Sequence, residues 1–240
     1  MNIRVIATLF LFLLYTPTFS QNKMRVLDEL INNEDSGWPI VQDWIKSAKN
    51  KVEVLAVDTS KANKALLHTQ VTTRSIMGAI VYHSGGLLID NGWIRILGSG
   101  HEKLPRSLPS WNEGKLKNSL LIADDVIGGF FILNGGGLGS DLGKIYYLAP
   151  DNLTYEALDR GYSEFLEFCL NGDLEKFYDG LRWKNWRADV SKINGDQVFN
   201  FYPFLWTKEG KDINKSSKKV ISVEEQYLFN MDAKKQLDTD

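Results

Sequence analysis

The sequence of 240 residues lacks the features that define disulfide-stabilised, metal-binding and nucleic-acid-binding proteins. A single cysteine excludes an intramolecular disulfide framework, so the stability of the fold must come from its core. The three histidines are isolated, and no spacing of potential ligands indicates a metal site. Lysine and arginine total 28 against 30 acidic residues, which gives no basic footprint for nucleic acid. We therefore expect no metal, no cofactor and no nucleic-acid partner.

Long hydrophobic runs are also scarce, and the most prominent one lies at the N-terminus. Residues 5–15 are apolar after Arg4, but they are too few to span a hydrocarbon core, which needs about 20 residues. Pro17 ends the run. A cleavage site after Ser20 would have the small residues Thr18 and Ser20 at its third and first preceding positions. We expect residues 1–20 to be a secretory signal peptide, so that the mature protein is secreted or periplasmic without a stable membrane anchor. The alternative is an uncleaved anchor.

The rest of the chain has an ordinary globular composition, with 43% hydrophobic and 24% charged residues. Apolar residues recur at helical spacing before residue 70 and again after residue 160. The middle of the chain instead contains short apolar runs separated by turn residues, which is typical of consecutive antiparallel strands. We therefore predict an α+β fold with an antiparallel sheet.

The strand patterns set the expected organisation of the chain. Asn91 and Gly92 tolerate positive φ and predict a tight hairpin turn. Ser222 begins a capping-box pattern that opens a last short helix. We expect one α+β domain over residues 21–207, followed by a flexible connector and this short helix over residues 208–240. The predicted strands are 52–57, 76–82, 87–90, 93–97, 120–123, 130–133 and 144–148, with an edge strand or packed loop at 199–206.

Patterns of catalytic residues are weak. The lone Cys169 lies in an apolar helical stretch and is expected to be a buried structural thiol. Asp124 and Asp125 could form a carboxylate pair for glycoside chemistry, but neighbours in sequence usually point apart, and we expect turn or solvent residues. Most of the seven tryptophans sit at core spacing. Trp111 is the exception, because it lies in a polar, turn-prone stretch.

A group of cations near the glycine-rich corner at residues 98–100 comes closest to a binding site. Its members are close in sequence to the ends of predicted strands, where they could dock an anionic patch of a partner. The alternative is a set of scattered, solvated charges whose aliphatic stems cover the core. With Trp111 added, the candidate binding residues are Arg74, Arg95, His101, Arg106 and Trp111, and Lys103 lies among them.

A series of short motifs lies between Met24 and Trp206. Its segments are Trp38–Val41, Val71–Ser75, Gly85–Trp93, Leu97–Gly100, Leu104–Ser107, Trp111–Asn112, Ala123–Asp125, Gly128–Phe131, Tyr146–Asp151, Leu181–Trp183 and Phe201–Trp206. These motifs resemble those of a bacterial family, the domain-of-unknown-function family 2625. The resemblance covers most of the chain after residue 20, but it implies no known activity.

A shorter stretch of the chain contains the segments Ile122–Asp125, Gly128–Gly129, Gly143–Tyr147 and Tyr162–Leu166 in this order. The stretch is similar to the SMI1/KNR4-type module. This resemblance implies a twisted antiparallel sheet flanked by helices, and a role in binding proteins, often as an immunity protein against a toxin. The predicted signal peptide departs from that group, because many of its immunity proteins act in the cytosol.

These observations predict an exported, non-enzymatic module that binds a protein or peptide. The first alternative is an envelope protein that binds or hydrolyses glycans, using Asp124, Asp125 and exposed tryptophans. The second alternative is a structural envelope protein without a discrete site.

Overall fold

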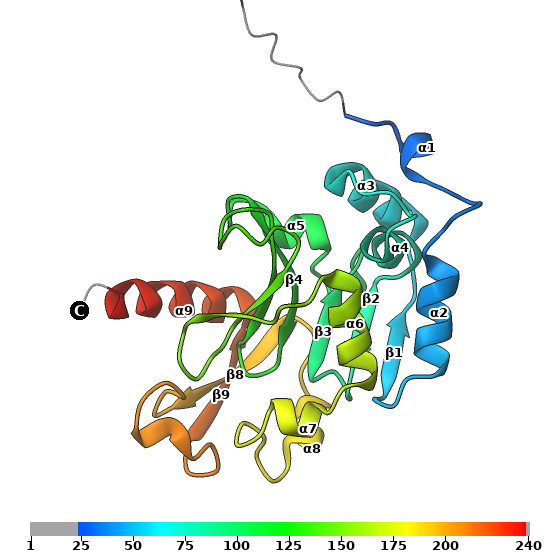
Figure 1. Ribbon diagram of the computed structural model, residues 1–240. Helices are drawn as coiled ribbons and strands as arrows, with labels where there is room; N and C mark the ends of the chain where they lie inside the picture. Colours follow the sequence, from blue (N-terminus) through cyan, green and yellow to red (C-terminus); the bar gives the residue numbers. More distant parts are fainter. Residues whose placement is uncertain (1–23, 239–240) are drawn as a thin grey trace, which may run out of the picture.

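The computed structural model describes residues 24–238, and the predicted signal peptide at residues 1–20 lies outside them. The described chain forms a seven-stranded sheet, a two-stranded sheet and surrounding helices (Figure 1). The seven strands lie in sequence order from β1 to β7, and each is antiparallel to the next. The predicted α+β class is confirmed.

The two sheets and the helices have the following bounds. The strands are β1 Val52–Leu55, β2 Gly86–Ile89, β3 Ile94–Leu97, β4 Ser119–Asp125, β5 Phe130–Asn134, β6 Ile145–Leu148, β7 Tyr155–Ala157, β8 Gln197–Tyr202 and β9 Ser217–Ser222. The helices are α1 Leu27–Leu30, α2 Trp38–Lys46, α3 Thr59–Thr69, α4 Ile76–His83, α5 Leu108–Asn112, α6 Tyr162–Asn171, α7 Leu174–Phe177, α8 Trp186–Val190, the 3₁₀ helix η1 Glu209–Lys211 and α9 Val223–Leu237.

The predicted hairpin between β2 and β3 is present. Asn91 has φ of 60° and Gly92 has φ of 86°, and the Trp93 N–H donates to the Asp90 carbonyl at 3.2 Å. Positive φ at both central positions is what a type I′ turn requires, and asparagine and glycine adopt it at low cost. The turn fixes the register in which Leu88 faces Arg95 across the two strands. This local sequence therefore positions part of the site described below.

Residues 76–82 were predicted as a strand, and this prediction is wrong. They belong to α4, whose N-cap Ser75 accepts a hydrogen bond from the Gly78 N–H. The first half of the helix packs tightly, because a Cβ on Gly78 would lie 2.1 Å from the Thr72 carbonyl oxygen. Ala79, Ile80 and Val81 are all fully buried, so the segment is apolar around most of its circumference and lacks helical periodicity.

Residues 208–219 were expected to be a flexible connector, but two parts of this segment have regular structure. They include η1 and the start of β9, which pairs with β8 from Ser217 to Ser222. Ile213 is buried and anchors the loop between the two elements. The polar composition that suggested a connector belongs to an edge strand, where lysines such as Lys218 and Lys219 protect the unpaired side.

The C-terminal helix is also longer and better packed than expected. Ser222 caps α9 by accepting from the Glu225 N–H, as its sequence predicts, but the helix then runs for 15 residues. Val223 and Tyr227 are buried in the main core, and the Asn230 side chain donates to the Gly128 carbonyl at 2.8 Å. The C-terminal residues thus contribute to the same core as the large sheet.

We expect the stability of the fold to depend on the protonation of His83, at the end of α4. Its ring stacks on Trp38, with centroids 5.3 Å apart, and burial lowers the pKa of His83 below its ordinary value of about 6.5. Below pH 6.5 the unfolded chain therefore binds more protons than the folded chain, so the free energy of unfolding falls as the pH is lowered. Above that pH this contribution is constant.

Urea unfolding of the wild type and of His83→Gln between pH 7.5 and 5.5 tests this expectation. The wild type should lose stability toward pH 5.5, and the variant should show a flatter dependence because glutamine does not titrate. His68→Gln makes the same substitution on the exposed side of α3 and serves as the matched control. Equal slopes for the wild type and His83→Gln would contradict the assignment.

Candidate functional site

Two of the predicted cations meet at one buried carboxylate. The Arg95 Nε on β3 donates to Asp124 Oδ1 at 2.5 Å, and an Arg106 terminal nitrogen donates to Asp124 Oδ2 at 2.6 Å. The side chain of Asp124 is fully buried, and those of Arg95 and Arg106 are 2% and 10% exposed. Burial lowers the pKa of Arg95, and the charge of Asp124 opposes this effect. The cluster is therefore an internal network of paired charges.

The same arginines hold the segment that precedes β8. Arg95 donates to the Gln197 carbonyl at 2.5 Å, while Arg106 donates to the Gly195 carbonyl at 2.5 Å and to Asp196 Oδ1 at 2.9 Å. Arg95 and Asp124 are direct cross-strand partners on β3 and β4, so the sheet register brings them together. The network thus fastens residues 195–197 to the large sheet.

Trp111, predicted as a binding residue outside the core spacing of the other tryptophans, is buried on α5 with 3% of its surface exposed. Its ring lies beneath two cations, with the Arg106 Cζ at 4.6 Å and the Lys115 Nζ at 4.1 Å from the ring centroid. Phe130 and Tyr227 pack against it from the sheet and from α9. The structure therefore places Trp111 next to the arginine network rather than at the surface.

The other two predicted residues lie outside this network. Arg74 precedes α4 and forms an exposed ion pair with Asp35 at 3.1 Å. His101 forms an isolated β-bridge with Leu104, and its Nδ1 accepts from the Lys103 N–H at 3.1 Å. The structure thus brings together Arg95, Arg106 and Trp111, and it leaves Arg74 and His101 elsewhere.

Asp124 and Asp125 were expected to be turn or solvent residues, and this expectation is wrong, since both are fully buried. Asp125 Oδ1 accepts from the N–H groups of Ile127 and Gly129, at 3.1 and 2.8 Å. Its Oδ2 accepts from the hydroxyls of Tyr147 and Tyr178, at 2.6 and 3.1 Å. Burial raises the pKa of Asp125, while these hydrogen bonds act in the opposite direction. Both carboxylates hold the end of β4 in place and are closed to substrate.

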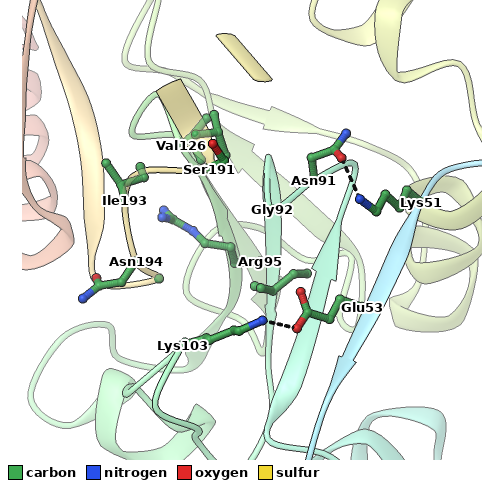
Figure 2. Close-up of a pocket in the computed structure, with 13 residues that line it drawn as sticks. Lys51, Glu53, Asn91, Gly92, Arg95, Lys103, Val126, Ser191, Ile193 and Asn194 are labelled. Atoms are coloured by element: carbon green, nitrogen blue, oxygen red, sulfur yellow. Dashed lines mark hydrogen bonds and ion pairs between the residues drawn. The ribbon is translucent and has the colours of Figure 1, made fainter. Parts of the chain in front are cut away.

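The arginine network borders an open cavity of about 370 Å³ between the first three strands and the segment that follows α8 (Figure 2). Leu88, Arg95 and Val126 line its sheet side, and Val190 and Ile193 line the opposite wall. Further lining residues are Lys51, Glu53, Asn91, Gly92, Lys103, Ser191, Asn194 and Gly195. The cavity therefore combines apolar walls with a polar, charged rim.

The rim of the cavity carries two lysines and one glutamate. Lys103 Nζ contacts Glu53 Oε1 at 2.5 Å, and Lys51 Nζ donates to Asn91 Oδ1 at 3.2 Å, as Figure 2 shows. The Lys103 and Glu53 side chains are 57% and 49% exposed, so water screens their interaction and either can change partners. The rim has an excess of positive charge toward solvent.

Sequence reasoning identified Arg95 but missed most of the cavity. The signal that could have revealed it is the strand register, which aligns Glu53, Leu88 and Arg95 as successive cross-strand partners. The opposite wall could not be found in this way, because Val190 and Ile193 lie about a hundred residues along the chain from Leu88 and Arg95 and belong to no strand of the large sheet. Lys103 was within the predicted cation group, although it was not among the proposed contacts.

The remaining groups with potential chemistry are metal-ligating side chains and the single thiol. Within residues 24–238, no group of three or more His, Cys, Asp or Glu could hold a metal ion. Cys169 is buried, as expected, and burial raises the pKa of its thiol. No helix in the same range is long and apolar enough to cross a membrane.

Comparisons with known proteins place the chain in a family. It is 52% identical over 205 residues to the uncharacterized protein YbfG of Escherichia coli, a match that covers 84% of this chain and 94% of that protein. It is 45% identical over 222 residues to an uncharacterized protein of Haemophilus influenzae, covering 90% and 97% of the two chains. No solved structure matches significantly. A family model described as a protein of unknown function, DUF2625, matches residues 27–226, and the chain therefore belongs to the DUF2625 family.

Proposed function

We propose that this protein is an exported, non-enzymatic binding module that holds a peptide segment of a partner in the cavity beside β1, β2 and β3. The observation that carries the proposal is the cavity itself, with apolar walls, a charged rim and a volume of about 370 Å³. That volume lies within the range of about 300–1,000 Å³ found for ligand sites in proteins. Export rests on the pattern of residues 1–20.

The walls and the rim suit different parts of a peptide. Leu88, Val126, Val190 and Ile193 offer apolar contact for a side chain that leaves water. The rim lysines are exposed enough to exchange Glu53 and Asn91 for a carboxylate of the ligand at little cost. The arginine network holds the segment at residues 195–197, so one side of the cavity is preformed before any ligand binds.

Peptide selection on the purified protein tests this proposal. Peptides enriched from a random displayed library would be synthesised with a fluorophore, and their dissociation constants measured by anisotropy. Ser191→Trp fills the cavity and Lys103→Glu reverses a rim charge, so each should weaken binding about tenfold or more. Lys64→Glu is the control, because Lys64 is exposed on α3 and does not line the cavity.

Two outcomes would contradict the proposal. One is that no peptide is enriched, while a glycan array run in parallel yields a saccharide that raises the melting temperature. The other is a set of selected peptides whose affinity is unchanged by both Ser191→Trp and Lys103→Glu, although thermal unfolding shows that the variants are folded.

A further inference from the structure

The cavity lies beside an open edge of the large sheet. β1 is the first strand in the sheet order and pairs with β2 on one side, and no strand within residues 24–238 pairs with its other side. Val54 is 39% exposed at this edge. Lys51, just before the strand, and Glu53, within it, line the cavity. The edge and the cavity therefore form one continuous surface.

The hydrogen bonds of β1 show which backbone groups face outward. The Asp90 N–H donates to the Lys51 carbonyl at 2.8 Å, and the Gly85 N–H donates to the Leu55 carbonyl at 2.9 Å. In an antiparallel pair, the residues whose backbone groups face the partner strand alternate with those whose groups face away. The backbone groups of Val52 and Val54 therefore point away from β2, where a further strand could bind them.

The three other outer strands, β7, β8 and β9, are less suited to this role. The other side of β8 is already in use, because its Phe199 N–H donates to the Val126 carbonyl at 2.8 Å. β9 carries Lys218 and Lys219, a charge pattern that discourages pairing at an edge. β7 has only three residues, and the hydroxyl of its Tyr155 lies 3.7 Å from the Met231 sulfur of α9. β1 instead alternates valine with a single glutamate whose charge Lys103 already pairs.

We infer that an extended, acidic peptide segment adds to β1 as an eighth strand of the sheet. This inference rests on the proposed function and specifies its mode of binding. Main-chain hydrogen bonds to Val52 and Val54 would supply affinity, as in other cases of strand addition. Alternate side chains of the added strand would point to the cavity side of the sheet, where Lys51, whose ammonium is bonded to the neutral Asn91 amide, favours carboxylates. The remaining side chains would extend the apolar surface of Val54.

A designed probe tests the inference directly. The probe is a fluorescein-labelled, acetylated octapeptide of four valine–aspartate repeats, and a valine–lysine peptide of equal length is its charge control. Val54→Pro removes an outward N–H that the sheet does not use, and proline is tolerated at such edge positions. We expect Val54→Pro to weaken binding of the acidic probe about tenfold or more, whereas Val54→Thr keeps the N–H and should bind within about twofold of the wild type.

N-methylated versions of the probe keep the test independent of how Val54→Pro folds. Methyl groups on one alternating set of amides face β1 and should abolish binding, whereas methyl groups on the other set face solvent and should be tolerated. Equal effects of the two methylation patterns would overturn strand addition, as would tighter binding of the lysine peptide.

The outcomes separate this inference from the proposed function. If Ser191→Trp abolishes binding of the selected peptides but Val54→Pro and both methylation patterns leave it unchanged, the cavity binds peptides and strand addition is wrong. If the acidic probe fails to bind while selected peptides occupy the cavity, the inferred ligand class is wrong. If binding of the probe and of every selected peptide is unchanged by both Ser191→Trp and Lys103→Glu, the proposed function itself fails.

Discussion

Replacing Arg95 with alanine is expected to lower the free energy of unfolding by about 3–5 kcal/mol, the usual cost of removing one partner from a buried charge network. The change leaves Asp124 fully buried with only Arg106 as a cationic partner. It also removes the donors to the Gln197 and Asp125 carbonyls, at 2.5 and 3.0 Å. Equilibrium urea unfolding followed by tryptophan fluorescence measures the loss.

The matched control for this variant is Arg74→Ala, from the same predicted group of cations. Arg74 and Asp35 form an exposed ion pair, with side chains 62% and 66% exposed, so its loss should cost less than about 1 kcal/mol. Combining Arg95→Ala with Asp124→Asn should recover part of the lost stability, because Arg106 then no longer has to offset both Asp124 and Asp196. A loss below about 1 kcal/mol for Arg95→Ala would mean that its guanidinium is not needed by the fold.

Local sequence signals predicted much of this fold correctly. The hairpin at Asn91 and Gly92 and the cap at Ser222 depend on a few adjacent residues, and the structure confirms both. The segment at residues 76–82 behaved differently, because it is buried on most sides and its apolar residues have no period. Ser75 was the only local indication of a helix there, and Gly78 is explained only by its contact with Thr72. Tertiary contacts decided that element.

The candidate site depends even more on contacts that are distant in sequence. The predicted group of cations included Arg95 and Arg106 as contacts for a partner, whereas the structure pairs both with Asp124, which was expected to be a turn or solvent residue. Its burial follows from the register between β3 and β4, and residues 195–197 lie about a hundred positions from Arg95. Periodicity carries no information on such pairings. For the same reason, the cavity wall after α8 could be identified only in three dimensions.

Replacing Trp93 with alanine is the second change for which we expect a loss of about 3–5 kcal/mol in the free energy of unfolding. Trp93 is fully buried, and its ring centroid lies 4.8 Å from that of Trp186 and 5.3 Å from that of Tyr178. The Arg182 guanidinium lies over the same ring at 4.8 Å. Truncation would open a large void and remove one aromatic face from a cation that is nearly buried.

Trp93→Phe tests whether the expected loss comes from the void and the missing aromatic face. It preserves a face for Arg182 and fills much of the void, so its loss should be clearly smaller than that of Trp93→Ala. Both variants are measured by urea unfolding, with circular dichroism as the signal because the mutation changes fluorescence. Equal losses for the two variants would contradict this account of the cluster.

The aromatic side chains packed on Trp93 also support one wall of the cavity. Trp186 begins α8 and packs on Trp93, and Val190 at the other end of α8 lines the cavity wall. If the helix shifts when Trp93 is truncated, selected peptides should bind Trp93→Ala more weakly even under conditions where it remains folded. Trp93→Phe should retain more of that affinity. Unchanged peptide affinity in folded Trp93→Ala would show that the position of α8 does not set the shape of the binding site.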